Sequence, residues 1–294
     1  MSALIRLLYS IILGIIQGVS EWLPISSKTQ IIVSSTILLK LSFQQAYTFG
    51  LFMEVGTIVA AVIYFRKELA GLVRAILGSK DRVQRKSLGY VVVVTVVTGV
   101  IGAPLYLIAD SIAGAVQPGK ALAPVEGIPM LIMGFILLAD AAIIRYSQKR
   151  RVKGAILKKL ENLTVKDYVL IGITQGVSAL PGVSRSGITT STMLLLNVEP
   201  DEAFRLSFMA GIFAAIGAFG LTLIATESNV AASIAGIGLT GLIVAIVTST
   251  IISLLLIDFL IRVAGKQKIT YLTAGLGTIA VVSGLVYLVL LIIS

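Results

Sequence analysis

Two short polar segments contain the residue types that bind phosphate groups. One covers residues 24–28 and the other residues 181–187, where Arg185 lies between two serines. Each segment follows the same tetrapeptide, Gln-Gly-Val-Ser, which begins at Gln17 in the first case and at Gln175 in the second. Two copies of one loop, far apart in the chain, predict a duplicated fold.

The second segment has the chemistry of an oxyanion site. A Pro-Gly turn at Gly182 leads into a hydroxyl-rich stretch, and such a helix start presents unpaired backbone N–H groups at the positive end of a helix dipole. Arg185 adds a planar fork of donors that matches phosphate oxygens. In apolar surroundings these groups need a ligand, a metal ion or a partner carboxylate to satisfy them. Phosphate is the simplest ligand that fits.

The composition places these segments in a membrane. Hydrophobic residues make up 57% of the chain and charged residues 13%, and the mean hydropathy is +1.01. Such values exclude a soluble globule with a polar surface and predict an all-α polytopic membrane protein. The excess of 24 Lys and Arg over 14 Asp and Glu indicates topology and contact with anionic membrane lipids, and no nucleic acid is expected as a partner.

Short and long apolar stretches alternate along the chain. Residues 3–16 and 31–39 are apolar but too short, at 1.5 Å per residue, to cross a hydrocarbon core of about 30 Å. A polar loop over residues 17–30 separates them, which favours a re-entrant helical hairpin, and residues 168–200 repeat this pattern. Six full transmembrane helices are expected over residues 46–65, 88–109, 127–147, 202–224, 234–261 and 271–293.

The basic loops predict the topology. Residues 66–86 and 149–166 are rich in Lys and Arg, so both loops should be cytoplasmic and both termini should lie on the outer face of the plasma membrane. The two hairpins then face opposite ways, which is an inverted-topology repeat within a single membrane domain, residues 1–294. Repeat one covers approximately 1–147 and repeat two approximately 168–294. Charge counting does not separate a re-entrant hairpin from two crossings, and length favours re-entrance.

Two acidic residues lie where a membrane makes them costly. Glu21 follows Gln17 by four residues, so both share a helical face if the first helix continues that far. Glu54 lies in the middle of an apolar span. A carboxylate in such a span favours a functional or site-supporting role, and the alternative is a buried ion pair that only fixes packing.

The combined motifs resemble a known family. Gln17-x-x-x-Glu21, followed by Leu-Pro-Ile-Ser-Ser at residues 23–27, and Pro-Gly-Val-Ser-Arg-Ser-Gly-Ile-Thr at residues 181–189, look like the two signatures of the undecaprenyl-diphosphatase family associated with bacitracin resistance. The resemblance covers nearly the whole chain. It implies a membrane phosphatase that removes the terminal phosphate from a polyprenyl diphosphate and regenerates the lipid carrier for cell-wall glycan synthesis. It also implies a site that opens to the outer face.

The resemblance assigns roles residue by residue. Catalytic roles fall on Glu21, Ser27 and Arg185, and Glu21 is also the expected ligand of a divalent cation, Mg²⁺ or Ca²⁺. By position the motifs also carry over Gln17, Ser26, Ser184, Ser186 and Thr189, which are expected to bind substrate. The same role is expected, without the resemblance, for Glu54 in its apolar span, for Gly182 in the Pro-Gly turn and for Gln30. Two mechanisms stay open: attack by Ser27 with Glu21 as proton acceptor, or attack by a water that Glu21 activates, with or without the metal.

Position 30 departs from the family pattern, which commonly has a histidine there. Gln30 cannot act as acid, base or phosphoryl acceptor at neutral pH. Either the chemistry does not need an imidazole, or this member is slow, specialised or inactive. In the first case Gln30 would only orient the substrate.

Other classes of function are weighed against this one. An inverted repeat with broken helices is also a transporter architecture, so a non-hydrolytic carrier or flippase of polyprenyl phosphate or another anion is the alternative. A lipid phosphatase of the acid-phosphatase-like type depends on histidines, and the chain has none. The oligomeric state stays open, with a homodimer among the alternatives.

Overall fold

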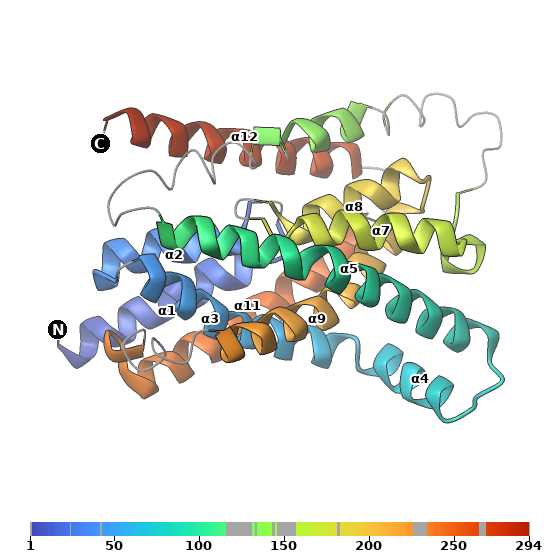
Figure 1. Cartoon of the computed structure of the whole chain (residues 1–294), viewed down its shortest axis with the longest axis horizontal. Helices are drawn as coiled ribbons and strands as arrows, with labels where there is room; N and C mark the ends of the chain where they lie inside the picture. Colours follow the sequence, from blue (N-terminus) through green and yellow to red (C-terminus); the bar gives the residue numbers. More distant parts are fainter. Residues whose placement is uncertain are drawn as a thin grey trace.

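The computed structural model is helical throughout its described part. It describes residues 2–23, 25–41, 43–115, 131–132, 134–142, 145, 157–180, 183–225, 234–264 and 269–293. Its labelled elements are α1 (Ala3–Ser20), α2 (Ser27–Leu39), α3 (Phe43–Tyr64), α4 (Arg66–Ile76), α5 (Arg82–Ala115), η2 (Leu160–Asn162), α7 (Val165–Val177), α8 (Arg185–Leu195), α9 (Pro200–Ala225), α11 (Gly238–Ala264) and α12 (Ile269–Ile293) (Figure 1). Residues 134–142 are also helical.

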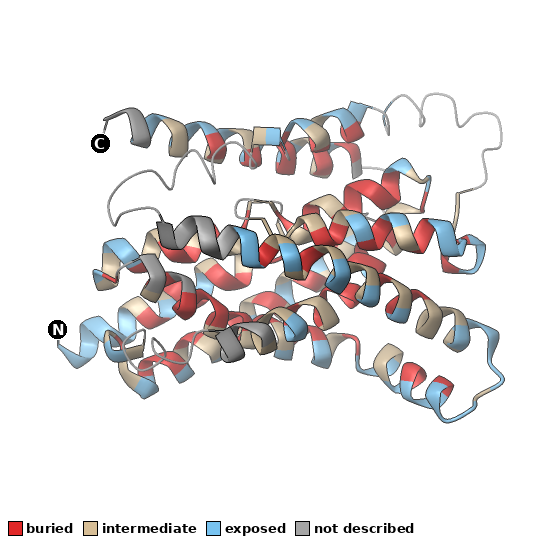
Figure 2. Cartoon of the chain, viewed as in Figure 1, coloured by how far each residue is buried: buried red, intermediate tan, exposed pale blue. Residues whose placement is uncertain are grey.

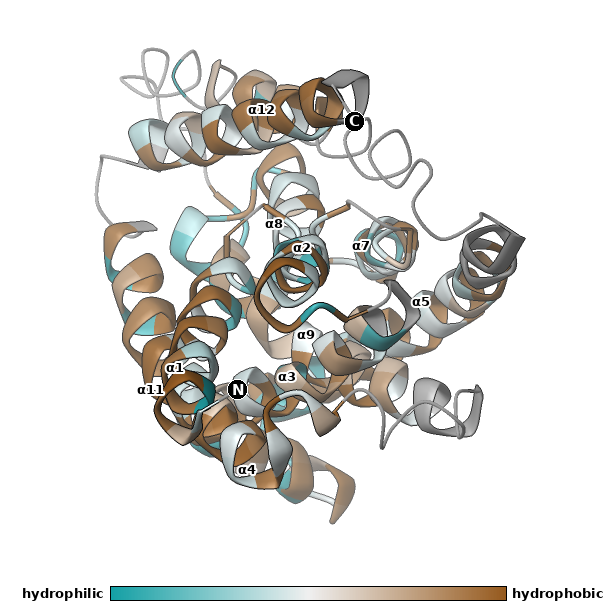
Figure 3. Cartoon of the chain, turned by 90° about the vertical axis from the view of Figure 1, so that its left-hand side faces the viewer, coloured by the Kyte–Doolittle hydropathy of each residue, from teal (hydrophilic) through white to brown (hydrophobic). Residues whose placement is uncertain are grey.

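Several of these helices could cross a membrane. In the described part five helices are long and apolar enough, namely α1, α5, α9, α11 and α12, and there are six if α3 and α4, bent by 75° at their junction, count as one. Their outward faces carry large apolar side chains that are exposed, such as Val100, Leu255 and Phe259, and this hydrophobic exterior is visible on α11 and α12 (Figure 3). The prediction of an all-α polytopic membrane protein is therefore confirmed.

The first helix is longer than its apolar run. It has 18 residues, about 27 Å at 1.5 Å per residue. The helix continues through its polar end because polar groups there form hydrogen bonds within the helix. Ser20 Oγ donates to the carbonyl oxygen of Ile16 at 2.5 Å, and the N–H of Glu21 donates to the carbonyl oxygen of Gln17 at 3.1 Å. The prediction that residues 3–16 are too short to cross was wrong on this length. The polar loop is correspondingly shorter than predicted, since α2 already begins at Ser27.

Other helix boundaries differ from the predicted ones because of helix caps and amphipathic patterning. The predicted loop over residues 66–86 contains α4, which buries Leu72 and Ala75. The next helix begins at Arg82, not at residue 88, because Asp81 Oδ1 accepts the N–H of Val83 at 2.8 Å as a cap. The predicted spans at 202–224, 234–261 and 271–293 correspond to α9, α11 and α12 with small shifts. The predicted span at 127–147 lies only partly within the described residues.

Two helical hairpins point at each other from opposite ends of the molecule. The α1–α2 hairpin enters from the left of Figure 1 and the α7–α8 hairpin from the right, and their tips meet near the centre. The buried residues concentrate on the faces that surround this meeting point (Figure 2). Each hairpin packs against a long helix of the other half of the chain, α1 against α11 and α7 against α5.

Glycines allow these close contacts. A Cβ at Gly14 would lie 2.6 Å from the carbonyl oxygen of Ala245, and one at Gly18 would lie 2.8 Å from Ile252 Cβ. The same spacing recurs in α7, where a Cβ at Gly172 would lie 2.7 Å from Val97 Cβ. Pairs of small residues four positions apart are a general means of bringing membrane helices together.

The glycine contact between α1 and α11 gives a first prediction. Gly18→Ala should lower the free energy of unfolding by about 1–3 kcal/mol, because the added methyl group has no space and the helices must separate. Gly89→Ala is the matched control, since nothing lies within 4 Å of a Cβ there, and it should be neutral or slightly stabilising. Thermal unfolding in detergent measures both variants. Equal stabilities would contradict the packing argument.

Candidate active site

A cavity of about 330 Å³ lies beside the two hairpin tips. It is bounded by α2, α3, α5 and α9 and by the end of α7 with the loop into α8. The polar residues that line it are Glu21, Ser26, Ser27, Lys28, Glu54, Thr95, Thr98, Tyr106, Gln175, Ser178, Ser184 and Arg185. The rest of the wall is made of small or apolar residues, so the polar groups are concentrated in water-poor surroundings.

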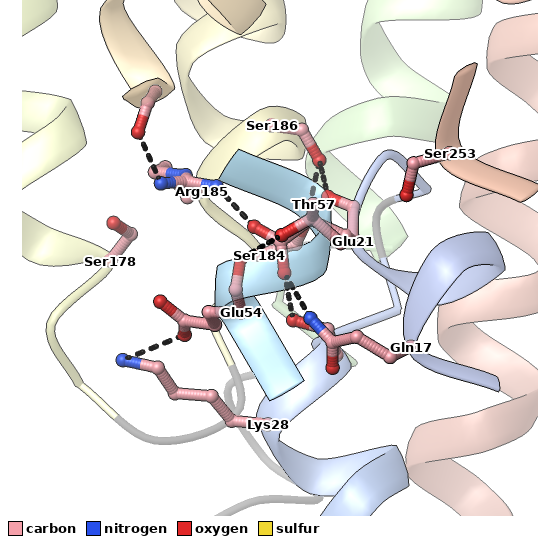
Figure 4. Close-up of polar contacts among 12 residues, drawn as sticks. Gln17, Glu21, Lys28, Glu54, Thr57, Ser178, Ser184, Arg185, Ser186 and Ser253 are labelled. Carbon is pink, nitrogen blue, oxygen red and sulfur yellow. Dashed lines mark hydrogen bonds and ion pairs between the residues drawn. The ribbon is translucent and has the colours of Figure 1, made fainter. Parts of the chain in front are cut away.

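Glu21 is the centre of the polar cluster. One carboxylate oxygen, Oε2, accepts hydrogen bonds from Ser27 Oγ at 2.6 Å and from Gln17 Nε2 at 3.0 Å. The other, Oε1, forms an ion pair with Nη2 of Arg185 (Figure 4). The Glu21 side chain is only 5% exposed. The structure thus brings together the three residues predicted to be catalytic, and it does so across the two hairpins.

Arg185 is held in place by a helix backbone. Its Nη1 donates to the carbonyl oxygen of Gly211 in α9 at 2.6 Å, and a Cβ at Gly211 would lie 3.3 Å from Arg185 Cζ. A guanidinium has five N–H donors, and the contacts with Glu21 and Gly211 use two of them. Donors therefore remain for an anion in the cavity.

Two serines of the second hairpin form hydrogen bonds with the tip of the first hairpin. Ser184 Oγ caps α8 by accepting the N–H of Gly187 at 3.3 Å and donates to the carbonyl oxygen of Leu23 at 3.2 Å. Ser186 Oγ donates to the carbonyl oxygen of Glu21, also at 3.2 Å. Ser184 lines the cavity. Ser186 bonds the first loop and is not among the lining residues, so for both serines the predicted binding of substrate stays a prediction.

The first loop adds a second pair of charges. Lys28 Nζ lies 3.8 Å from Glu54 Oε1, and both residues line the cavity (Figure 4). Ser26 also lines it and has a backbone φ of 53°, a left-handed conformation that is uncommon for a residue other than glycine and typical of functional loops. Its hydroxyl lies 3.0 Å from that of Thr29. It therefore does not cap α2.

Besides Ser186, three more residues predicted to bind substrate lie outside the cavity wall. Gln17 is buried and directs its amide at Glu21. Gln30 donates to the carbonyl oxygen of Ile25 at 3.2 Å, so its amide bonds the loop backbone. Thr189 is fully buried and pairs with the hydroxyl of Ser207 on α9. Their direct contact with substrate stays a prediction, and in the structure their side chains hold the loops and α8. Gly182 lies outside the described residues.

Gln175 and two threonines of α5 were missed. Thr95, Thr98 and Gln175 line the cavity, yet none was singled out as a site residue. For Gln175 the signal was present, since it begins the second copy of the repeated Gln-Gly-Val-Ser tetrapeptide. The threonines lie in an ordinary apolar span, where sequence alone does not tell a hydroxyl that faces a cavity from one that bonds its own helix.

The charges in the cavity balance each other. Two carboxylates, of Glu21 and Glu54, face two cations, of Arg185 and Lys28. The described residues contain no group of three or more His, Cys, Asp or Glu side chains arranged to hold a metal. The two carboxylates are nevertheless oxygen ligands of the kind that Mg²⁺ prefers, and Mg²⁺ commonly takes one or two carboxylates together with phosphate oxygens.

These features define a class of protein, the polytopic helical membrane proteins in which two opposed hairpins bring a carboxylate, a hydroxyl and a guanidinium into one buried cavity. The family model described as bacitracin resistance protein BacA matches residues 10–281. The chain belongs to this family.

Relatives from archaea agree with this assignment. The undecaprenyl-diphosphatase of Saccharolobus solfataricus is 44% identical over 280 residues, which cover 95% of this chain and 96% of the relative. That of Sulfurisphaera tokodaii is 45% identical over 278 residues, 94% of this chain and 97% of the relative. That of Pyrobaculum islandicum is 38% identical over 283 residues, 96% and 98% of the two chains.

Gly211 offers a test of the Arg185 position. Gly211→Ala should weaken the binding of inorganic phosphate by up to about tenfold, because the methyl group forces the guanidinium away from its rotamer. Gly220→Ala on the same helix is the control, since a Cβ there has nothing within 4 Å. Calorimetric titration of both variants in detergent gives the affinities. An unchanged affinity for Gly211→Ala would show that this carbonyl does not position Arg185 for the anion.

Proposed function

We propose that this protein hydrolyses a polyprenyl diphosphate, such as undecaprenyl diphosphate, to the monophosphate and inorganic phosphate, and so recycles the lipid carrier for cell-wall glycan synthesis. The observation that carries the proposal is the contact of Glu21 with both Ser27 and Arg185. A hydroxyl bonded to a carboxylate and placed near a guanidinium is the arrangement of an activated nucleophile with a stabilised phosphoryl group. The names of the relatives and the family match support the same reaction.

In the proposed reaction Ser27 is the nucleophile. Its oxygen forms a bond to the terminal phosphorus while the bond from that phosphorus to the bridging oxygen breaks, and Glu21 Oε2 takes the hydroxyl proton. The lipid monophosphate leaves and takes this proton from Glu21. Water then attacks the phosphoserine and the bond from phosphorus to Ser27 Oγ breaks; Glu21 takes a proton from the water and returns it to Ser27 Oγ, and inorganic phosphate is released. The contact at 2.6 Å between Ser27 Oγ and Glu21 Oε2 favours this route over direct attack by water.

Arg185 and the start of α8 would stabilise the phosphoryl group during transfer. Charge spreads over its three equatorial oxygens, and the remaining N–H donors of Arg185 would face them at a helix N-terminus. The proton path in this mechanism involves Glu21 and does not include position 30. Since Gln30 bonds the Ile25 carbonyl oxygen, a glutamine there is compatible with hydrolysis.

A divalent cation would fit the same cavity. Glu21 and Glu54 would supply carboxylate oxygens, and the diphosphate would supply the rest, as is usual for Mg²⁺. When bound, the ion would neutralise charge on the transferred group. Glu54 would then exchange its long contact with Lys28, 3.8 Å in the structure, for the ion.

For the membrane arrangement we propose an inverted-topology repeat in which both hairpins are re-entrant. The helices α2, α7 and α8 have 13, 13 and 11 residues, too few to span about 30 Å. Helix α1 has 18 residues and is long enough to cross, but the second arm of its hairpin, α2, is too short to cross back, so in this proposal the α1–α2 hairpin is re-entrant because of α2. The reciprocal packing of α1 on α11 and of α7 on α5 is what a two-fold related pair of halves would produce. The basic residues near α4 and η2 would then lie in the cytoplasm, and the cavity would face the outer side of the plasma membrane.

Cysteine labelling tests this orientation. Cysteines introduced at residues 2 and 294 should both react with an impermeant maleimide in intact cells, because both termini are expected outside. Lys159→Cys places a cysteine beside η2, among the basic residues expected in the cytoplasm, and should react only after the cells are opened. Protection of either terminal cysteine in intact cells would contradict the arrangement.

Phosphate release tests the reaction itself. The purified protein should release inorganic phosphate from undecaprenyl diphosphate in detergent, and a chelator should stop the release until Mg²⁺ or Ca²⁺ is restored. Arg185→Lys should lower the rate by about 10²-fold or more, since the charge stays but the fork of donors is lost. Glu21→Gln should abolish turnover and leave lipid binding largely intact, because a base acts mainly on the transition state.

A carrier would give a different result. Arg185 variants would then weaken anion binding itself, and Glu21→Gln need not stop movement of the lipid. If the wild-type protein releases no phosphate with any metal, yet binds polyprenyl diphosphate through Arg185, the phosphatase proposal fails.

A further inference from the structure

Gln175 is a buried amide without a partner. It is 1% exposed, it lines the cavity, and neither its nitrogen nor its oxygen has a hydrogen-bond partner among the described residues. Leaving such a group unsatisfied is costly, and most buried polar side chains in proteins are paired. A ligand in the cavity would satisfy it.

The equivalent residue of the other hairpin explains why this amide is free. Gln17 occupies the same position of the repeated tetrapeptide, and its amide donates to the carboxylate four residues later, Glu21. Four residues after Gln175 the chain has Ala179, a methyl group that also lines the cavity. The two hairpins therefore use one glutamine position in two ways, to orient the base in the first and to face the cavity in the second.

The packing places Gln175 and Arg185 at different levels of the cavity. The helices α5, α7 and α9 run in the same direction (Figure 1). Thr192 on α8 donates to the Thr174 hydroxyl on α7 at 3.0 Å, and Thr189 on α8 pairs with Ser207 on α9. Arg185, at the start of α8, contacts α9 at Gly211.

Gln175 directly follows Thr174, whereas Arg185 lies seven residues before Thr192, at the start of α8. At 1.5 Å per residue the backbone of Arg185 is therefore offset from that of Gln175 along the hairpin by on the order of one to two helical turns. Gln175 also lies against α5, since a Cβ at the next residue, Gly176, would lie 2.7 Å from Ile101, and α5 lines the cavity as far as Tyr106.

We infer that Gln175 binds the phosphate that remains on the lipid, while Ser27 and Arg185 hold the phosphate that leaves. This inference rests on the proposed function, because it divides the two phosphates of one diphosphate between two levels of the cavity. The amide N–H groups would donate to the oxygens of the retained phosphate. The hydroxyl of Thr95, also buried without a partner in the described part of the chain and also lining the cavity, lies on the same wall.

The test compares three ligands. Calorimetric titration in detergent would measure the Kd values of farnesyl diphosphate, farnesyl monophosphate and inorganic phosphate. Gln175→Met should weaken the monophosphate and the diphosphate by about tenfold, the effect of losing one hydrogen bond to a charged group. Inorganic phosphate, which Arg185 should hold, should keep its affinity. In phosphate release with the diphosphate, KM should rise and kcat should change little.

Two further variants separate binding from folding. Gln175→Glu keeps the size of the side chain but adds a negative charge, so it should weaken the monophosphate more than Gln175→Met does. Thr48→Val is the control: Thr48 is buried with an unpartnered hydroxyl, lies outside the cavity wall, and should leave all three affinities unchanged. A merely structural role for Gln175 would alter thermal stability without changing the ratio of monophosphate to phosphate affinity.

These measurements distinguish a failure of the Gln175 inference from a failure of the proposed hydrolysis. Unchanged monophosphate affinity in Gln175→Met, or an equal loss for inorganic phosphate, would overturn the assignment to the retained phosphate. If the wild-type protein releases no phosphate but Gln175→Met still weakens only the prenyl phosphates, the hydrolase proposal fails and the binding role of Gln175 stands.

Discussion

The ion pair between Glu21 and Arg185 joins the two halves of the molecule at the tips of the two hairpins. Removing two charges from water costs several kcal/mol per ion, and only good geometry with further hydrogen bonds offsets it. Here Ser27 and Gln17 complete the Glu21 carboxylate and the Gly211 carbonyl oxygen binds the guanidinium. The pair therefore depends on both hairpin tips, and the position of each tip depends on the pair.

Close helix packing makes that meeting possible. The hairpins reach the centre because glycines let α1 approach α11 and α7 approach α5 at distances that no side chain would allow. Each hairpin is thus fixed by a long helix of the opposite half, and the serines of the second loop bond the carbonyl groups of the first. These contacts fix the position of the donors in the site, which suits a reaction that depends on preorganised donors.

The two hairpins contain the same tetrapeptide, Gln-Gly-Val-Ser, and differ in chemistry. One carries the carboxylate and the serine hydroxyl, and the other carries the guanidinium and a glutamine whose carboxylate partner is replaced by Ala179. A symmetric pair would place two carboxylates or two arginines beside one another, which like-charge repulsion opposes. The asymmetry gives a cavity in which a carboxylate, a serine hydroxyl and N–H donors suited to an anion coexist.

The sequence by itself determined the helical membrane class, the duplicated loops and the cluster of Glu21, Ser27 and Arg185, because hydropathy and motif spacing are local properties of the chain. Only the tertiary structure decided where the helices end, since Ser20 and Asp81 act through hydrogen bonds that an apolar run does not reveal. It also decided which polar residues reach the cavity. Gln30 and Thr189 bond the loop backbone and α9, whereas Gln175 and Thr95 face the cavity, and that difference depends on how helices from distant parts of the chain rotate against each other.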